Sequence, residues 1–249
     1  MITKHNFSFE VRQVHLHSKL YFSFKNWKNY LNPEFCCRFL QFEFTNTPKD
    51  NDFTGQTLRI FQAGHLFEDL AIKWLRDTGF ELLTEKANGS QFGFSVASGK
   101  VRGHIDGVIT KAPDSLNLTL PMLWECKSLN NKSWQDTVKK KLAKSKPIYA
   151  AQVAIYQAYM ESSIEGISNN PALFTAINKD TAELYHELVP FDAKLAQQLS
   201  DKAVNILKAT KANELLPPIS TKRDYYTCNF CPWQERCVQY KWIYNHSPS

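Results

Sequence analysis

The decisive stretch of the chain reads VRGHIDGVIT at residues 101–110 and LPMLWECKS at residues 120–128, with a polar turn between them. Both runs are short and rich in apolar residues, and Pro113-Asp114 marks the turn. These features predict two β-strands that flank the turn segment 111–117. The rest of the predicted fold is arranged around this strand pair.

Charged side chains gather at one end of the strand pair. Side chains two residues apart on a strand share a face, so Glu125 and Lys127 point one way and Trp124 and Cys126 point toward a core. Asp106 lies on the partner strand between two glycines that permit a bend. Isolated charges are costly to bury, so this cluster needs a cation or a polar ligand. Two acids suit magnesium or manganese, and the alternative is a surface hairpin with ordinary charges.

The two runs together resemble the PD-(D/E)XK nuclease superfamily. Gly-His-Ile-Asp-Gly places Asp106 19 residues before Glu125-Cys126-Lys127, where the motif of that superfamily stands. The resemblance implies an α/β fold of the restriction-endonuclease-like type, with a central mixed sheet flanked by helices. It also implies metal-dependent hydrolysis of DNA.

A long amphipathic helix is predicted at residues 56–78, ahead of the strand pair. Glu68 lies along its largely apolar stripe, one turn after Gly64, and the plain alternative is a boundary glutamate whose carboxylate reaches solvent. RecB-like nucleases carry a helical Gly-x-x-x-His motif or, in phage-type exonucleases, Gly-x-x-x-Glu at this place. Gly64-His-Leu-Phe-Glu68 is similar to the glutamate form. The resemblance therefore implies Glu68 as a third acid and ranks His65 below it.

A second helix, predicted at residues 149–162, carries Gln152 and Tyr156 on one face. An incidental glutamine on a core helix is the alternative. RecB-like nucleases have a Gln-x-x-x-Tyr motif on the helix after the Lys strand, so the resemblance implies that this pair binds phosphate or orients Lys127. The other expected elements are strands at 80–84 and 92–97, a hairpin at 173–178 and 183–189, and a helix at 192–212.

A lysine-rich segment at residues 130–146 follows the acidic cluster. A solvated helix is the usual interpretation of such a run, and contact with a DNA backbone is the alternative. Both interpretations stay open.

The cysteines are concentrated near the two ends of the chain. Cys228, Cys231 and Cys237 have the spacing C-x2-C-x5-C in a polar segment, which indicates a metal site. Zinc and iron–sulfur sites take four ligands, so the fourth comes from Cys36 or Cys37.

This layout resembles the iron–sulfur RecB-like exonucleases, including the CRISPR-associated family-four exonucleases. There one N-terminal and three C-terminal cysteines hold a 4Fe-4S cluster, and the first cysteine often begins Cys-Pro-Arg. Cys36-Cys37-Arg38 fits with Cys37 in the proline position, which favours Cys36 as the ligand. The alternative is Zn²⁺ on the same thiols. The cluster would join segments 23–45 and 219–242 around a core at 56–212.

The composition sets outer limits on the function. Of 249 residues 43% are hydrophobic and 13% aromatic, which favours a globular core over disorder. The net charge of +6 fits a polyanion without requiring one. No apolar run approaches the roughly 20 residues that cross a bilayer, and no signal peptide is evident. We expect one soluble cytoplasmic domain spanning residues 1–249, without a disulfide framework.

With the resemblance, the sequence predicts a divalent-metal-dependent DNA exonuclease. Asp106 and Glu125 would hold Mg²⁺ or Mn²⁺, with the Cys126 carbonyl as a further ligand and Glu68 completing the shell. Lys127 would orient water and counter the charge that develops on the phosphate. The alternatives are a structure-specific or restriction-type endonuclease and a DNA-binding module that has lost catalysis. The resemblance suggests phage recombination, repair or CRISPR DNA processing as the setting, acting on single strands or duplex ends.

Overall fold

The computed structural model describes residues 36–50, 54–97, 101–220, 222, 224, 225, 228 and 231–237. The start of the expected N-terminal cysteine segment, residues 23–35, and parts of 219–242 lie outside the described residues. The described helices and strands are α1 (Cys37–Phe44), α2 (Gly55–Asp77), β1 (Glu81–Leu83), β2 (Gly93–Val96), β3 (Val101–His104), β4 (Gly107–Lys111), β5 (Met122–Leu129), α3 (Asn131–Ser145), α4 (Pro147–Met160), β6 (Ala172–Asn178), β7 (Leu184–Val189) and α5 (Ala193–Lys211). A 3-10 helix at Asp114–Leu116 fills the predicted turn.

A five-stranded mixed sheet with the order β1-β4-β5-β6-β7 forms the centre of the molecule. Strands β1, β4 and β5 pair antiparallel, β6 runs parallel to β5, and β7 returns antiparallel to β6. A parallel pair needs a long crossover connection, and α3 and α4 supply it. The expectation of a central mixed sheet flanked by helices is confirmed.

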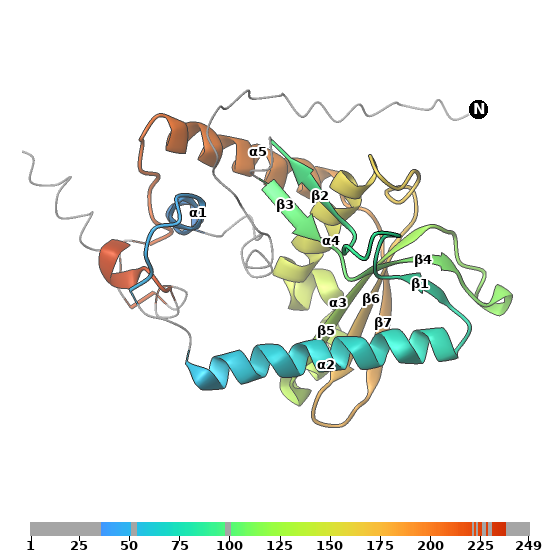
Figure 1. Cartoon of the computed structure of the whole chain (residues 1–249). Coiled ribbons are helices and arrows are strands. Elements are labelled where there is room, and N and C mark those ends of the chain that lie inside the picture. Colours follow the sequence, from blue (N-terminus) through green and yellow to red (C-terminus); the bar gives the residue numbers. More distant parts are fainter. Residues whose placement is uncertain are drawn as a thin grey trace, which may run out of the picture.

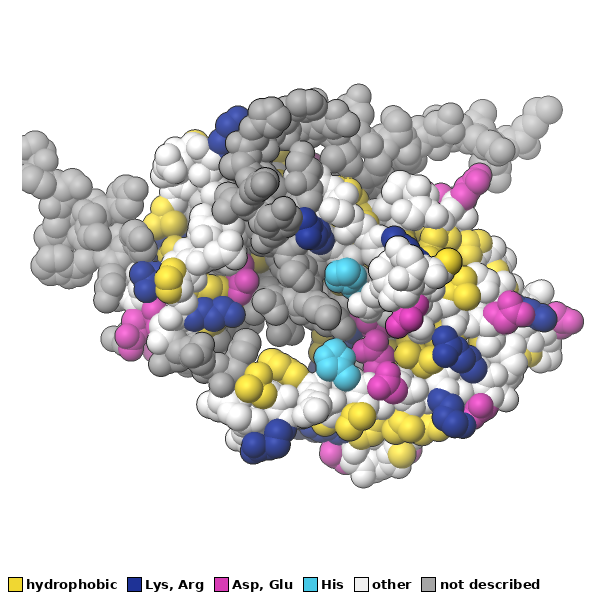
Figure 2. Space-filling view, in the orientation of Figure 1, with side chains coloured by type: hydrophobic (Ala, Val, Ile, Leu, Met, Phe, Trp, Pro, Cys, Tyr) yellow, Lys and Arg dark blue, Asp and Glu magenta, His cyan; other side chains and the backbone are white. Residues whose placement is uncertain are grey.

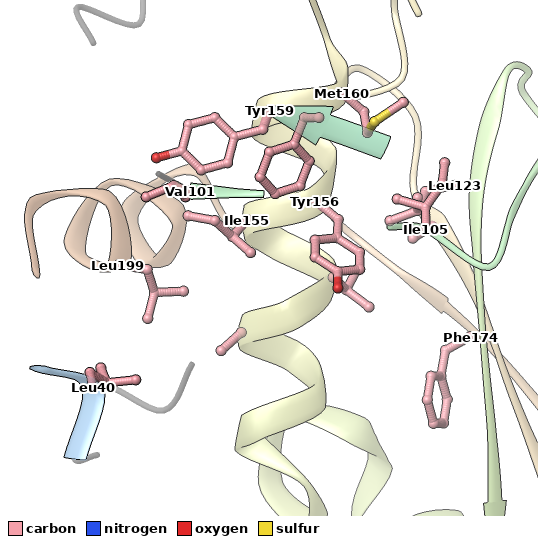
Figure 3. Packing of buried hydrophobic residues seen from close by; sticks show 14 of the residues in the cluster. Leu40, Val101, Ile105, Leu123, Ile155, Tyr156, Tyr159, Met160, Phe174 and Leu199 are labelled. Atoms are coloured by element: carbon pink, nitrogen blue, oxygen red, sulfur yellow. The ribbon is translucent and has the colours of Figure 1, made fainter. Parts of the chain in front are cut away.

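Helices cover both faces of this sheet (Figure 1). Trp124 and Cys126 of β5 pack against Ala71 and Leu75 of α2, as the period-two pattern predicts. The opposite face of β5 lies under α4. Figure 3 shows Tyr156 and Ile155 of α4 between Leu199 of α5 and the sheet residues Leu123 and Phe174. Glu125, which shares a face with Leu123, is therefore covered by a helix instead of standing at an open surface.

The predicted strand at 101–110 is wrong in one respect, because it is two strands that belong to different sheets. Strand β3 pairs with β2, whereas β4 enters the main sheet. At Gly103 the backbone passes so close to two rings that a Cβ atom would lie 2.5 Å from Phe94 and 2.9 Å from Tyr156. The chain passes close to α4 at this point and then turns at Ile105-Asp106. Asp106 therefore lies in the junction between β3 and β4 and not within a strand.

Helix α3 is interrupted where the sequence predicts a continuous lysine-rich helix. Lys141 has φ 64° and ψ 167°, a region that glycine alone adopts readily. The N–H of Leu142 donates to Glu187 of β7 at 2.9 Å, which anchors the chain just after the kink. Such a conformation costs about 1–3 kcal/mol, so the surrounding contacts must hold it in place.

The N-terminal and C-terminal described segments lie side by side (Figure 1). Arg38 of α1 donates to the carbonyl of Leu216 at 2.8 Å, and Gln41 exchanges hydrogen bonds with Glu214 and Leu216 at 2.6 and 2.7 Å. Trp233 is 1% exposed and packs edge-on against Phe39, with ring centroids 4.8 Å apart. These contacts join α1 to the described C-terminal segment. In the described part of the chain, no helix combines the length and the apolarity needed to cross a membrane.

Candidate active site

Three oxygen atoms converge on the ammonium group of Lys127. Its Nζ lies 3.5 Å from Oδ2 of Asp106 and 2.8 Å from the carbonyl oxygen of Cys126, and it also contacts Oε1 of Glu125. Asp106 is 2% exposed, Glu125 is fully buried, and the Lys127 side chain is 10% exposed. The junction between β3 and β4 thus supplies one acid, and β5 supplies the other acid and the lysine.

Hydrogen bonds fix the two carboxylates in place. The N–H of Cys126 donates to Oδ2 of Asp106 at 3.0 Å, so the β3–β4 junction is tied to β5 at the site itself. The amide of Gln152 on α4 donates to Oε1 of Glu125 at 2.8 Å. Gln152 Oε1 is buried and has no hydrogen-bond partner among the described residues.

The electrostatics of the site keep Lys127 charged. Burial alone would lower the pKa of Lys127, but the Asp106 and Glu125 carboxylates raise it, and the net pKa is well above its usual value. Burial raises the pKa of the Cys126 thiol, and the charge of Asp106 adds to this effect. Cys126 therefore offers its backbone carbonyl to the site, while its side chain stays a neutral part of the core.

The oxygen atoms around Lys127 Nζ are the kind that a hard divalent cation prefers. Two carboxylate oxygens and one peptide carbonyl match the ligands of Mg²⁺ and Mn²⁺, and the ammonium stands in for such a cation. Within the described ranges, no group of three or more His, Cys, Asp and Glu side chains is arranged to hold a metal ion. The oxygen atoms around the ammonium are therefore of the right chemical type to bind a metal ion, but in this structure Lys127 Nζ occupies the position between them.

Glu68 of α2 lies at the same end of β5. Its charge contributes, after that of Asp106, to raising the pKa of Cys126. Its side chain is 20% exposed and its Oε2 lies 3.9 Å from Nδ1 of His65. A Cβ atom on Gly64 would meet no atom nearer than Ser128 Oγ at 3.8 Å, so this glycine is not required for space. Figure 2 shows histidine and acidic side chains gathered between α2 and the strand pair β2–β3.

The two residues of the Gln-x-x-x-Tyr pattern have different surroundings. Gln152 bonds Glu125 and not Lys127. Tyr156 is 1% exposed and packs edge-on against Phe94, with ring centroids 5.7 Å apart. Burial, together with the nearby carboxylates, raises the pKa of Tyr156. Tyr156 therefore acts in this structure as a core residue beneath the site.

Sequence reasoning missed Tyr149, which lies one turn before Gln152 on α4. Lys127 Nζ stands over its ring, 5.5 Å from the centroid, a distance at which the ring attracts a cation. Its spacing to Gln152 and Tyr156, three and then four residues, places all three on one face of α4. That spacing is the signal that could have identified it.

The four cysteines favoured as cluster ligands are all described and lie near one another. Burial raises the pKa of Cys231 to about 12, and the thiols of Cys36, Cys237 and Cys228 add to the effect. The N–H of Ile219 donates to Cys36 Sγ at 3.4 Å. Arg38, which the Cys36-Cys37-Arg38 motif already includes, donates to Cys237 Sγ at 3.7 Å. Cys36 also contributes to raising the pKa of Cys237, after burial, which has the largest effect.

Comparison with known proteins gives only a distant likeness. No protein-family model and no curated protein matches the sequence. An alkaline exonuclease from Laribacter hongkongensis is 18% identical over 61% of this chain and 69% of that chain, with a TM-score of 0.44. A crystal structure of SSO0001 is 16% identical over 90% of this chain and 89% of that chain, with a TM-score of 0.43. At these values the function must be argued from the site of this chain itself.

Proposed function

We propose that this protein is a divalent-metal-dependent deoxyribonuclease that acts as an exonuclease on DNA ends. The observation that supports the proposal is the convergence of Asp106, Glu125 and the Cys126 carbonyl on one position, which the Lys127 ammonium occupies. Structural ion pairs also occur in protein interiors, but a fully buried acid in the middle of a helix-covered strand, next to a second acid, is costly without a functional reason.

Each side chain has a distinct task in this proposal. Asp106, Glu125 and the Cys126 carbonyl hold the metal ion, and Glu68 completes its surroundings. When bound, Mg²⁺ or Mn²⁺ polarises the phosphate and lowers the pKa of the attacking water. Lys127 counters negative charge on the phosphate in the transition state. Gln152 holds Glu125 in its orientation through the 2.8 Å hydrogen bond.

The proposal also includes the replacement of the Lys127 ammonium by a metal ion at the three oxygens. The three oxygens could not surround an ammonium and a metal ion at the same time, so a bound metal ion would take the place of Lys127 Nζ. The ring of Tyr149 already lies beside the ammonium and offers an attractive surface that keeps the displaced group near the site.

Digestion of DNA with defined ends tests the proposal. We expect the purified chain to degrade end-labelled linear DNA in the presence of Mg²⁺ or Mn²⁺, and to leave DNA intact in EDTA. Closed circular DNA should survive, because an exonuclease needs an end. Cleavage of the closed circle would support the endonuclease alternative, and metal-independent binding without cleavage of either substrate would support a DNA-binding module.

The cysteines form a second part of the proposal. We infer that Cys36, Cys228, Cys231 and Cys237 hold a 4Fe-4S cluster that reinforces the contact between the two ends of the chain. The support is that the N-terminal and C-terminal thiols lie in one contact region: the N–H of Ile219 donates to Cys36 Sγ at 3.4 Å, and Arg38 donates to Cys237 Sγ at 3.7 Å. Zn²⁺ on the same four thiols is the competing occupant.

Replacing Cys231 with serine should abolish the cluster. Wild-type protein purified without oxygen is expected to be brown, with about four iron atoms per chain and visible absorbance that a reductant bleaches. The Cys231→Ser variant should lose most of the iron and colour, whereas Cys37→Ser, the matched control, should keep both. Colourless wild-type protein with stoichiometric zinc would contradict the iron–sulfur assignment. Loss of iron in the Cys37→Ser variant would show that Cys37, and not Cys36, is the N-terminal ligand.

A further inference from the structure

Helix α3 presents a basic groove outside the candidate active site. Lys132, Lys139 and Lys146 line an open groove of about 480 Å³, together with Ser133, Gln135 and Asp136. Lys132 and Lys139 are seven residues apart, close to two helical turns, so they lie on one side of α3, and Lys146 comes after the kink at Lys141 and lines the same groove. The sequence alone could not distinguish a solvated lysine run from a binding surface. The structure favours a binding surface, because it brings three of the lysines together along one groove.

The charge of the groove is strongly positive. Lys132 and Lys139 are exposed and Lys146 is half-buried. Asp136 is the acid among the lining residues, and its Oδ1 lies 2.7 Å from Nζ of Lys140, which does not line the groove. The negative charge of Asp136 is thus offset by a fourth lysine. The groove therefore suits a ligand that carries several negative charges in a row.

The two ends of the groove are close to Lys127. Lys132 follows Lys127 by five residues, so their Cα atoms are at most about 18 Å apart. At the other end, the carbonyl of Lys146 accepts a hydrogen bond from the N–H of Tyr149 at 2.9 Å, and the Tyr149 ring contacts Lys127 Nζ. A DNA strand rises about 3.4 Å per nucleotide, so roughly five nucleotides span 18 Å.

The backbone conformation of Lys141 is intrinsically unfavourable, so other contacts must hold α3 in its kinked shape. Its conformation is one that glycine alone adopts readily, and Glu187 anchors the next residue by accepting the Leu142 N–H. The kink separates Lys139 from Lys146, yet both line the same groove. Strained backbone of this kind is concentrated at sites where a fixed shape has a use.

We propose that the groove of Lys132, Lys139 and Lys146 binds the sugar–phosphate backbone of a DNA strand within about five nucleotides of the bond at Lys127. This inference rests on the proposed nuclease function for the bond at Lys127 and for the second readout, whereas phosphate binding in the groove does not depend on that function. The contact is with phosphates and carries no sequence information, so it contributes affinity and alignment.

The salt dependence of DNA binding tests the groove. The variant combines Lys132→Gln, Lys139→Gln and Lys146→Gln, and the control combines Lys194→Gln, Lys208→Gln and Lys211→Gln, which removes the same charge from exposed positions on α5. Fluorescence anisotropy with a 20-base-pair duplex in EDTA measures the slope of log K against log salt. We expect the groove variant to lose about 2–3 from the slope magnitude, since each phosphate contact contributes about 0.9, and the control to keep the wild-type slope.

Cleavage kinetics separate the groove from the reaction centre. With metal and linear DNA, the groove variant should show a raised KM and an unchanged kcat. If both variants lose the same amount of slope, the effect comes from the overall charge of the protein and not from the groove. If the groove variant keeps the wild-type slope, the lysines of α3 are only a solvated face. Either result overturns the proposal. If wild-type protein binds DNA through the groove but cleaves none, the nuclease function fails and the groove stands. If it binds no DNA, the groove is overturned as well.

Discussion

Replacing Lys127 with methionine should lower the rate of the proposed DNA cleavage by about two to three orders of magnitude, the usual effect of removing a group that stabilises transition-state charge. Methionine keeps most of the length of the side chain and removes only the ammonium. Asp106, Glu125 and the Cys126 carbonyl stay in place to hold a metal ion. Single-turnover cleavage of end-labelled linear DNA in saturating Mg²⁺ measures the effect.

Stability measurements make this result interpretable. In EDTA, the two buried carboxylates lose the ammonium between them, and breaking a buried ion pair costs about 3–5 kcal/mol. Mg²⁺ should restore part of this loss in Lys127→Met, because it supplies a cation at the same oxygens. Lys111→Met, which removes a surface lysine paired with Glu81, is the control and should leave rate and stability unchanged. Wild-type cleavage by Lys127→Met would remove Lys127 from the mechanism.

Replacing Glu125 with glutamine should lower cleavage by about three orders of magnitude and abolish the response to metal. The amide has nearly the same shape as the carboxylate but carries no charge, and glutamine is a poor ligand for Mg²⁺ in comparison with a carboxylate. Glu125 is fully buried and contacts Lys127, so the change acts at the centre of the site. The increase in melting temperature on adding Mg²⁺ reports metal binding independently of DNA.

The exposed residue Glu165 provides the control for this substitution, because Glu165→Gln removes the same charge far from the described site residues in the sequence. Wild-type protein and Glu165→Gln should both gain stability with Mg²⁺ and cleave DNA at the same rate. A full metal-dependent stabilisation in Glu125→Gln would show that Mg²⁺ binds elsewhere.

The period-two pattern of β5 allowed the centre of the site to be predicted from the sequence. Alternation in LWECK places Glu125 and Lys127 on one face and Trp124 and Cys126 on the other, and the structure has this arrangement. Gln152 was singled out by the resemblance to the Gln-x-x-x-Tyr motif, and in the structure its amide donates to Glu125. The cation position follows from short-range geometry within two segments.

The remaining features depend on contacts between distant segments. The break after His104 reflects pairing of β3 with β2, and the kink at Lys141 depends on Glu187, which is 46 residues later in the chain. The long apolar pattern of α2 predicted a buried stripe, yet among its residues only Ala71 and Leu75 are buried. Local periodicity cannot tell how much of a helix the sheet covers.

The joining of the chain ends has a similar explanation. Its expected cause was a metal cluster at the cysteines. In the structure, Arg38, Gln41 and Trp233 also make direct contacts between the segments. These partners are more than 170 residues apart in sequence, so no spacing rule could pair them. The cluster itself stays a prediction.

The most direct test of the whole account is a crystal structure of the protein soaked with Mn²⁺, with the metal located by its anomalous scattering. We predict a Mn²⁺ ion bound to the carboxylates of Asp106 and Glu125, with the Lys127 ammonium displaced from between them. An ammonium that still contacts both carboxylates at saturating Mn²⁺, with no anomalous peak beside them, would contradict the account.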